Sequence, residues 1–69
     1  MEIKVNGDTV SVAAEQPCVP DVLKAVGLDP ALSGIAVALN MEMVPRSLWD
    51  ETEVKAGDEL ELITARQGG

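Results

Sequence analysis

The chain of 69 residues contains no histidine, no phenylalanine and no tyrosine, and it has one tryptophan and one cysteine. Without histidine, the serines lack the usual general base, and a structural zinc site of the usual kind has no ligand set. One cysteine cannot form an intrachain disulfide. These absences argue against a nucleophilic hydrolase, a zinc module and a disulfide-rich secreted domain, and no metal site is predicted.

Basic residues are also scarce, because 5 lysines and arginines stand against 12 aspartates and glutamates, for a net charge of −7. Nucleic acid is therefore an unfavourable partner, whereas proteins with basic surfaces are favoured. The longest apolar run, residues 35–39, is far too short to span a bilayer, and the first residues lack the pattern of a signal peptide. Together with the lone thiol, these features predict a cytoplasmic protein with no membrane partner.

Aliphatic residues are abundant, since 46% of the chain is hydrophobic although it contains almost no aromatic side chains. A chain of this length forms one domain and buries only about 60% of the surface that its unfolded form exposes. Stability must therefore come from a small core of valine, leucine, isoleucine and alanine.

The first part of the chain is predicted to form a β-hairpin followed by a helix. Residues 1–5 and 9–12 alternate between apolar and polar side chains, and Asn6-Gly7 between them is a strong hairpin signal. The period then changes to that of a helix, with Pro20 expected at its first position and Gly27 at its end. The apolar positions of this helix follow the spacing i, i+3, i+4 and i+7: Val19, Val22, Leu23 and Val26.

The second part of the chain is predicted to add strands. Residues 35–39 form a third strand with large side chains on one face and alanines on the other, and residues 43–44 form a short edge strand before a proline. Residues 46–54 are expected to be mostly irregular, and residues 59–65 form the last strand. This order predicts an α+β domain over residues 1–65, with a mixed sheet of four to five strands and one main helix packed on one face. It is the order of the β-grasp, or ubiquitin-like, fold.

The sequence closes on Gly68-Gly69, and residues 66–69 are expected to form a flexible C-terminal tail. Glycine has no Cβ, so such a tail is thin enough to enter a narrow channel and presents an unhindered α-carboxylate. A tail of this shape suits the substrate of an activating enzyme. The pattern therefore indicates a carrier rather than a catalyst, with Gly69 as the reacting residue and Gly68 giving it clearance.

Five stretches of the chain form a recognisable set: the hairpin at Asn6-Gly7, residues 34–40, the Val-Pro-Arg-Ser-Leu-Trp stretch of residues 44–49, residues 57–61 and the terminal Gly68-Gly69. With these stretches the chain resembles the ThiS-type sulfur carriers of thiamine biosynthesis. The combination of residues 44–49 with the terminal glycines is the specific part of the resemblance, which runs nearly from end to end.

The resemblance implies a mechanism centred on the C-terminus. An adenylating activating enzyme of the ThiF type would use ATP to convert the Gly69 carboxylate to an acyl-adenylate. Sulfur drawn from a cysteine desulfurase would then give a thiocarboxylate, which a thiazole synthase of the ThiG type would accept. The covalent thiocarboxylate is the only group implied, with no bound cofactor and no catalytic residue in the chain itself.

Four residues are candidates for docking a partner, each with a structural alternative. Trp49 is interpreted as a docking contact or as a lid over the small core, and Arg46 as a partner contact or as a solvated charge. Glu59 and Glu61 form either an acidic docking surface for a basic activating enzyme or a solvated face. Cys18 is interpreted as a small buried hydrophobe rather than a sulfur-handling thiol.

Other functions remain open from the sequence. The small subunit of molybdopterin synthase has the same fold, the same tail and the same thiocarboxylate, although the Val44 to Trp49 stretch favours the thiamine carriers. A ubiquitin-like modifier would instead join its tail to lysines of target proteins. An acidic interaction domain with an idle tail is the third alternative.

Overall fold

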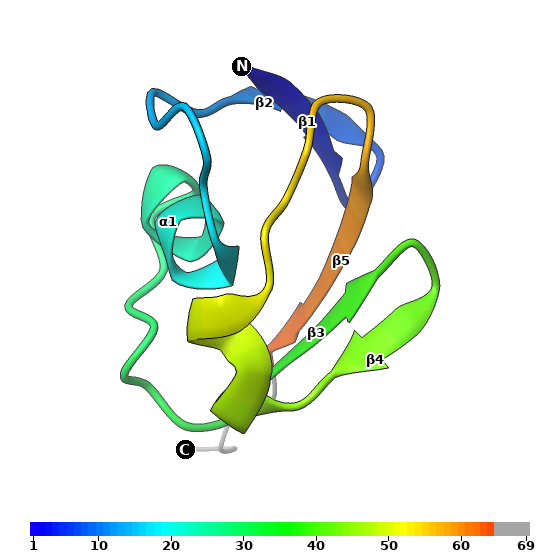
Figure 1. Ribbon diagram of the computed structural model, residues 1–69. Coiled ribbons are helices and arrows are strands. Elements are labelled where there is room, and N and C mark those ends of the chain that lie inside the picture. The colour runs from blue at the N-terminus through cyan, green and yellow to red at the C-terminus, as the bar shows by residue number, and fades with distance from the viewer. Residues whose placement is uncertain (65–69) are drawn as a thin grey trace.

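The computed structural model describes residues 1–64, and residues 65–69 lie outside the described part. Five strands form one mixed sheet in the order β2-β1-β5-β3-β4, in which β1 and β5 are parallel and the other neighbours are antiparallel. Figure 1 shows the helix α1 and the 3-10 helix η1 on the same side of this curved sheet. The elements are β1 (Glu2–Val5), β2 (Asp8–Ser11), α1 (Val19–Ala25), β3 (Ile35–Leu39), β4 (Glu42–Val44), η1 (Arg46–Glu51) and β5 (Glu59–Thr64). The predicted mixed sheet with one main helix on one face is confirmed.

The hairpin of β1 and β2 turns where the sequence predicts it. Asn6 and Gly7 have φ angles of 51° and 85°, the left-handed conformation that a two-residue type I′ turn requires at both positions. The turn fixes the register so that Ile3 lies opposite Val10. The apolar side chains of the two strands therefore face the same side of the sheet.

Helix α1 has two well-defined ends. At its start, the Asp21 carboxylate accepts a hydrogen bond of 2.9 Å from the Cys18 N–H. Val19 is the first helical residue, so Pro20 occupies the second position rather than the predicted first. At its end, Gly27 has the expected left-handed conformation, with φ 84°. Seven residues are too few for a helix that is stable alone, so packing on the sheet must hold α1.

The core lies between the sheet and the two helices. One face of the sheet, the inner faces of α1 and η1 and two connecting segments contribute its buried side chains: Ile3, Val5, Val12, Val19, Val22, Leu23, Val37, Trp49, Val54 and Leu60. The other face of the sheet carries no helix in the described part of the chain. Because side chains alternate along a strand, Ala36 and Ala38 lie on this open face, as predicted.

One local prediction needs correction, and one turn was not predicted. Residues 46–54 were expected to be mostly irregular, but Arg46–Glu51 form η1, in which the Leu48 N–H donates to the Pro45 carbonyl at 2.9 Å. The β3–β4 connection is a second turn with two left-handed residues, Asn40 and Met41, at φ 51° and 69°. A methionine at such a position is not a turn signal, so the sequence did not predict it. Strand β5 is described as far as Thr64, and the expected end at residue 65 lies outside the described residues.

None of the helices within residues 1–64 combines the length and the apolar character that crossing a membrane requires.

Candidate functional site

The predicted reacting residue Gly69 and its neighbour Gly68 lie outside the described residues. The described part of the site is the strand that leads to them, β5. This strand pairs with β3 from Leu39↔Leu60 to Ile35↔Thr64. On its other side it pairs with β1 only at Glu59 and Leu60. Beyond Leu60, strand pairing therefore supports β5 on one edge alone within the described chain.

Asn6 contacts β5 where the pairing with β1 ends. Its backbone N–H donates to the Leu60 carbonyl at 2.9 Å. Its side-chain Oδ1 accepts a hydrogen bond from the Leu62 N–H at 2.8 Å, and its Nδ2 donates to the Leu62 carbonyl at 3.2 Å. The side chain thus satisfies both main-chain groups of a residue 56 positions later in the chain.

Asn40 makes the corresponding contacts at the beginning of β5. Its backbone N–H donates to the Glu59 carbonyl at 2.8 Å, and its Oδ1 accepts from the Glu59 N–H at 3.0 Å. Its Nδ2 also donates to an Asp58 carboxylate oxygen at 3.2 Å. Asparagines from the turns of two neighbouring hairpins therefore hold β5 at its beginning, Glu59, and farther along, at Leu62.

The open face of the sheet carries an apolar strip beside the acidic residues of β5. We call Ala36, Ala38, Met43 and Ile63 the open-face strip. The strand register places Ala36 opposite Ile63 and Ala38 opposite Met43, which makes these side chains neighbours. Met43 and Ile63 are 63% and 61% exposed, so this apolar surface is available to a partner.

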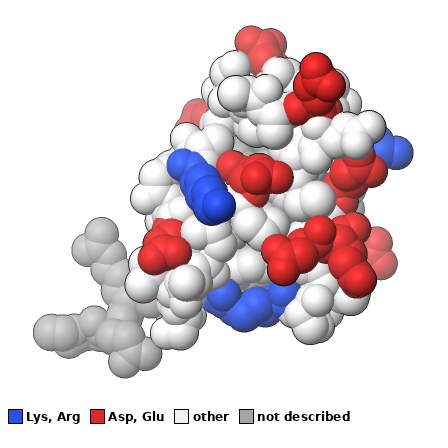
Figure 2. Space-filling model, turned by 60° about the vertical axis from the view of Figure 1, so that its left-hand side comes forward, with Lys and Arg blue, Asp and Glu red and all other residues white. Residues whose placement is uncertain are grey.

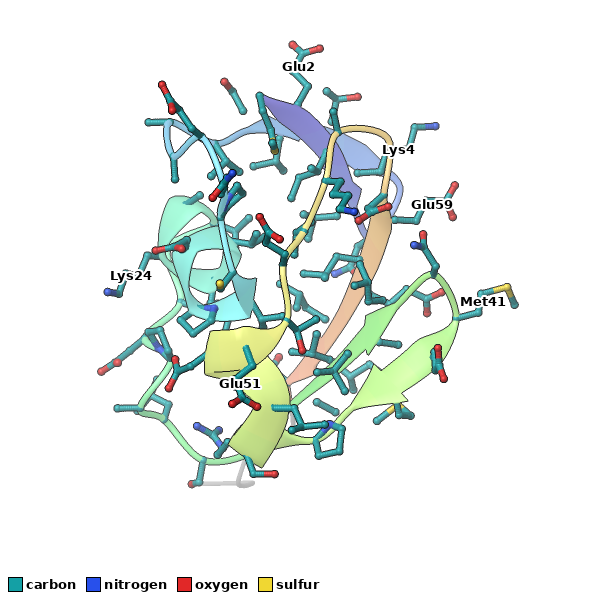
Figure 3. All side chains as sticks on the ribbon, viewed as in Figure 1. Glu2, Lys4, Lys24, Met41, Glu51 and Glu59 are labelled. Atoms are coloured by element: carbon teal, nitrogen blue, oxygen red, sulfur yellow. The ribbon has the colours of Figure 1, made fainter. Side chains whose placement is uncertain are left out.

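The predicted docking residues Glu59 and Glu61 are both exposed and lie on the same open face, by the alternation along β5. Glu61 is opposite Ala38 and thus borders the open-face strip. Glu59 is the parallel partner of Lys4, and Figure 3 shows the two side chains projecting outward from neighbouring strands. The structure therefore brings the two predicted carboxylates together with an exposed apolar surface that the sequence analysis did not identify.

The other two docking candidates, Arg46 and Trp49, lie together on η1. Trp49 is only 3% exposed, and its Nε1 donates to the Val44 carbonyl at 3.0 Å. The structure thus favours the interpretation of Trp49 as a lid over the core. The Arg46 Cζ lies 4.3 Å from the centre of the Trp49 ring, a cation–π contact.

The guanidinium of Arg46 is also engaged by the loop between α1 and β3. Its two terminal nitrogens donate to the carbonyls of Pro30 and Leu32. Arg46 therefore joins this loop to η1 and is more than a solvated charge. Arg46 and Trp49 are three residues apart, and side chains at this spacing eclipse each other on a 3-10 helix. Had the 3-10 helix been predicted, this spacing would have indicated their contact.

Cys18 is half-buried at the start of α1, so its expected burial is found only in part. Its backbone joins the segment before the helix to the segment after η1, as an isolated antiparallel bridge to Glu53. This position is structural.

The surface reflects the acidic composition. Figure 2 shows one face of the molecule, where acidic side chains are spread among uncharged ones and basic side chains are fewer. Such a surface is favourable for association with a basic partner over distances up to about 8 Å at physiological ionic strength.

Comparisons with known proteins match the chain from end to end. The model of the ThiS family matches residues 1–69. The curated sulfur carrier protein ThiS of Escherichia coli (strain K12) is 35% identical over 69 residues, which is the whole of both chains. The crystal structure of the thiamine biosynthesis protein ThiS from Geobacter metallireducens is 36% identical, with a TM-score of 0.80 and full coverage of both chains.

A solution structure of a thiamine biosynthesis protein from the same organism is also similar, with 36% identity and a TM-score of 0.80. It matches all of this chain over 88% of its own length. The structural matches confirm the predicted β-grasp, ubiquitin-like fold.

Proposed function

The chain belongs to the ThiS family, and from this membership we propose that it is a sulfur carrier of thiamine biosynthesis whose working group is the carboxylate of Gly69. The observation that carries the proposal is the match over the full length of the curated carrier, in a chain whose sequence closes on Gly68-Gly69. The carrier therefore takes precedence over the modifier and the interaction domain, which no observation favours.

The proposed chemistry follows from the poor reactivity of a carboxylate. Its oxygen attacks the α-phosphorus of ATP, pyrophosphate leaves, and the Gly69 carbonyl becomes part of a mixed anhydride with AMP. A persulfide, supplied through a cysteine desulfurase, then attacks the carbonyl carbon with its outer sulfur, AMP leaves, and an acyl disulfide forms. A second thiol attacks the inner sulfur of this S–S bond, forms a new disulfide with it and releases the outer sulfur on the Gly69 carbonyl. The thiocarboxylate that results is a nucleophilic sulfur, which a thiazole synthase accepts. We assign the catalytic groups for these steps to the partner enzymes.

The open face of the sheet is the proposed docking surface for the activating enzyme. The open-face strip reaches Ile63, so it lies next to the strand end from which residues 65–69 continue. An enzyme that receives Gly69 must approach this end of the molecule. Glu59 and Glu61 border the strip and give it the sign of charge that suits a basic partner. The burial of Trp49 makes it a poor contact by comparison.

Intact-mass spectrometry tests the proposed function. The protein is incubated with a ThiF-type activating enzyme, ATP and a sulfur source. We expect one oxygen to be replaced by one sulfur, in the C-terminal fragment. Deletion of Gly69 is the matched control and should remove the change while leaving the melting temperature unaltered. Sulfur found on Cys18 instead would contradict the proposal.

Reconstitution with acceptor enzymes separates the thiamine carrier from the small subunit of molybdopterin synthase. The thiocarboxylate form should support formation of the thiazole phosphate by thiazole synthase. It should support little molybdopterin formation with the large subunit of molybdopterin synthase. The opposite result would keep the thiocarboxylate chemistry and refute the assignment to thiamine biosynthesis.

A further inference from the structure

The side chain of Asn6 extends the support of β5 beyond the last residue of β1. Parallel pairing ends at Val5↔Leu60, because the chain of β1 turns at Asn6 and Gly7. Strand pairing with β3 uses one edge of β5, so the main-chain groups of Leu62 face the other edge. The side-chain amide of Asn6 therefore makes the hydrogen bonds that the main chain of a longer β1 would otherwise make to Leu62.

The hydrogen bonds between Asn6 and Leu62 lie at an exposed position beside the segment that follows α1. A surface hollow of about 340 Å³ lies beside it, lined in part by Asn6, Val10, Leu62 and Thr64. Water therefore has access to this edge of β5. Without the Asn6 side chain, the N–H and carbonyl of Leu62 would form hydrogen bonds with water instead. Strand ends with solvent-exposed hydrogen bonds are the parts of a domain that open most readily.

We propose that Asn6 is a positioning residue for the carrier reaction, because it holds Leu62 and so keeps β5 paired up to Thr64. This inference rests on the proposed function. While β5 stays paired, Thr64 keeps one position and one chain direction relative to the docking surface, and residues 65–69 continue from it. Asn6 touches no reacting atom and acts through the backbone of Leu62.

The consequence for the reaction follows from the length of the free segment. From Thr64, the five residues to Gly69 reach at most about 17 Å, at about 3.4 Å per residue. If β5 opened back to Leu60, four more residues would become free and the carboxylate would sample a larger volume. The effective concentration of a tethered group falls roughly as the −3/2 power of the tether length, which gives about a 2.5-fold loss. Ordering the released residues again at the active site adds to this loss.

The test compares Asn6→Gly with Asn40→Gly. Both asparagines have φ 51° in a hairpin turn, and glycine adopts this conformation without strain, so each variant loses the side-chain hydrogen bonds to β5 while the turn is kept. Asn40 bonds the beginning of β5, at Glu59, and is thus the matched control. The rate of Gly69 adenylation is measured over a range of carrier concentrations that reaches saturation, and the melting temperature of each variant is measured beside it.

We expect kcat for Asn6→Gly to fall about threefold to tenfold, the change in an equilibrium constant that the two solvent-exposed hydrogen bonds to Leu62 together represent. KM should change little, because the docking surface is intact. Asn40→Gly should lower the melting temperature by a similar amount and leave kcat unchanged. Amide exchange at Leu62 should become faster in Asn6→Gly and stay close to wild type in Asn40→Gly.

A third variant, Asn6→Asp, keeps the acceptor for the Leu62 N–H but sets a carboxylate oxygen against the Leu62 carbonyl oxygen, so its kcat should fall as well. An unchanged kcat in Asn6→Gly, or an equal loss in Asn40→Gly, would overturn the inference alone. A wild-type chain that is never adenylated would overturn the proposed function, and this inference with it.

Discussion

Replacement of Arg46 by alanine distinguishes a structural role of this residue from a role in docking. The change removes two hydrogen bonds to the carbonyls of Pro30 and Leu32 and the cation–π contact with Trp49. At this exposed position these contacts together contribute about 1–2 kcal/mol to the free energy of unfolding. For a domain of this size, that corresponds to a loss of about 5–15 °C in melting temperature. Thermal unfolding followed by circular dichroism measures it.

The control for this change is Arg46→Lys, which keeps the positive charge but cannot make a forked pair of hydrogen bonds. It should recover less than half of the lost stability. Adenylation measured well below the melting temperature should be close to wild type in both variants, because Arg46 serves the loop of residues 29–34 and not the docking surface. A normal melting temperature combined with a large rise in KM would refute this reasoning and restore Arg46 as a docking residue.

Two further changes test the turn of the second hairpin and the acidic face. Met41 is 88% exposed, and Figure 3 shows it projecting from the tip of the β3–β4 hairpin. Its φ of 69° is a left-handed conformation that is unfavourable for a residue with a Cβ. Met41→Gly should therefore raise the free energy of unfolding, measured by denaturant titration, by about 0.5–1 kcal/mol. Met41→Ala, which keeps a Cβ, should give no such gain. Neutralising Glu59 and Glu61 together by glutamine should lower the association rate with the activating enzyme at low salt and leave it nearly unchanged at high salt. The same change at Glu15 and Glu51 alters net charge equally, and an equal effect there would contradict a local docking role.

Much of the fold was predictable because it depends on local signals. The alternation of residues 1–5 and the Asn6-Gly7 turn define the first hairpin, and the helical spacing after Cys18 defines α1. The alternation of large and small side chains in residues 35–39 identified both faces of β3. In each case, the residues that determine the structure are close together in the sequence.

The features that were not predicted depend on contacts between distant parts of the chain. Helix η1 forms where Trp49 enters the core and Arg46 binds the loop before β3, and neither contact is visible in a window of a few residues. The turn at Asn40 and Met41 contradicts the usual preference for glycine at its second position. The contact of Asn6 with Leu62 joins residues 56 positions apart, so the sequence identified Asn6 only as a turn residue.

Some residues of the candidate site lie where the sequence analysis placed them, and others do not. Glu59 and Glu61 are exposed on one face, as a docking surface requires, whereas Trp49 is buried. The exposed apolar strip beside them was missed because Met43 and Ile63 belong to strands that are far apart in the sequence and are brought together by β3. The predictions for Gly68 and Gly69 lie outside the described residues and stay predictions.

The position of β5 in the sheet gives a physical reason why a small domain can serve as a carrier. The last strand of the chain is the middle strand of five, with β1 on one side and β3 on the other, and its Leu60 is in the core. A terminal strand at the edge of the sheet would open more readily, because half of its hydrogen bonds would face water. By placing this strand in the centre, and by holding Leu62 through Asn6, the domain fixes Thr64, where the described chain ends, relative to the open face. An enzyme that docks on this face, as we propose, would therefore meet the end of β5 in a defined place.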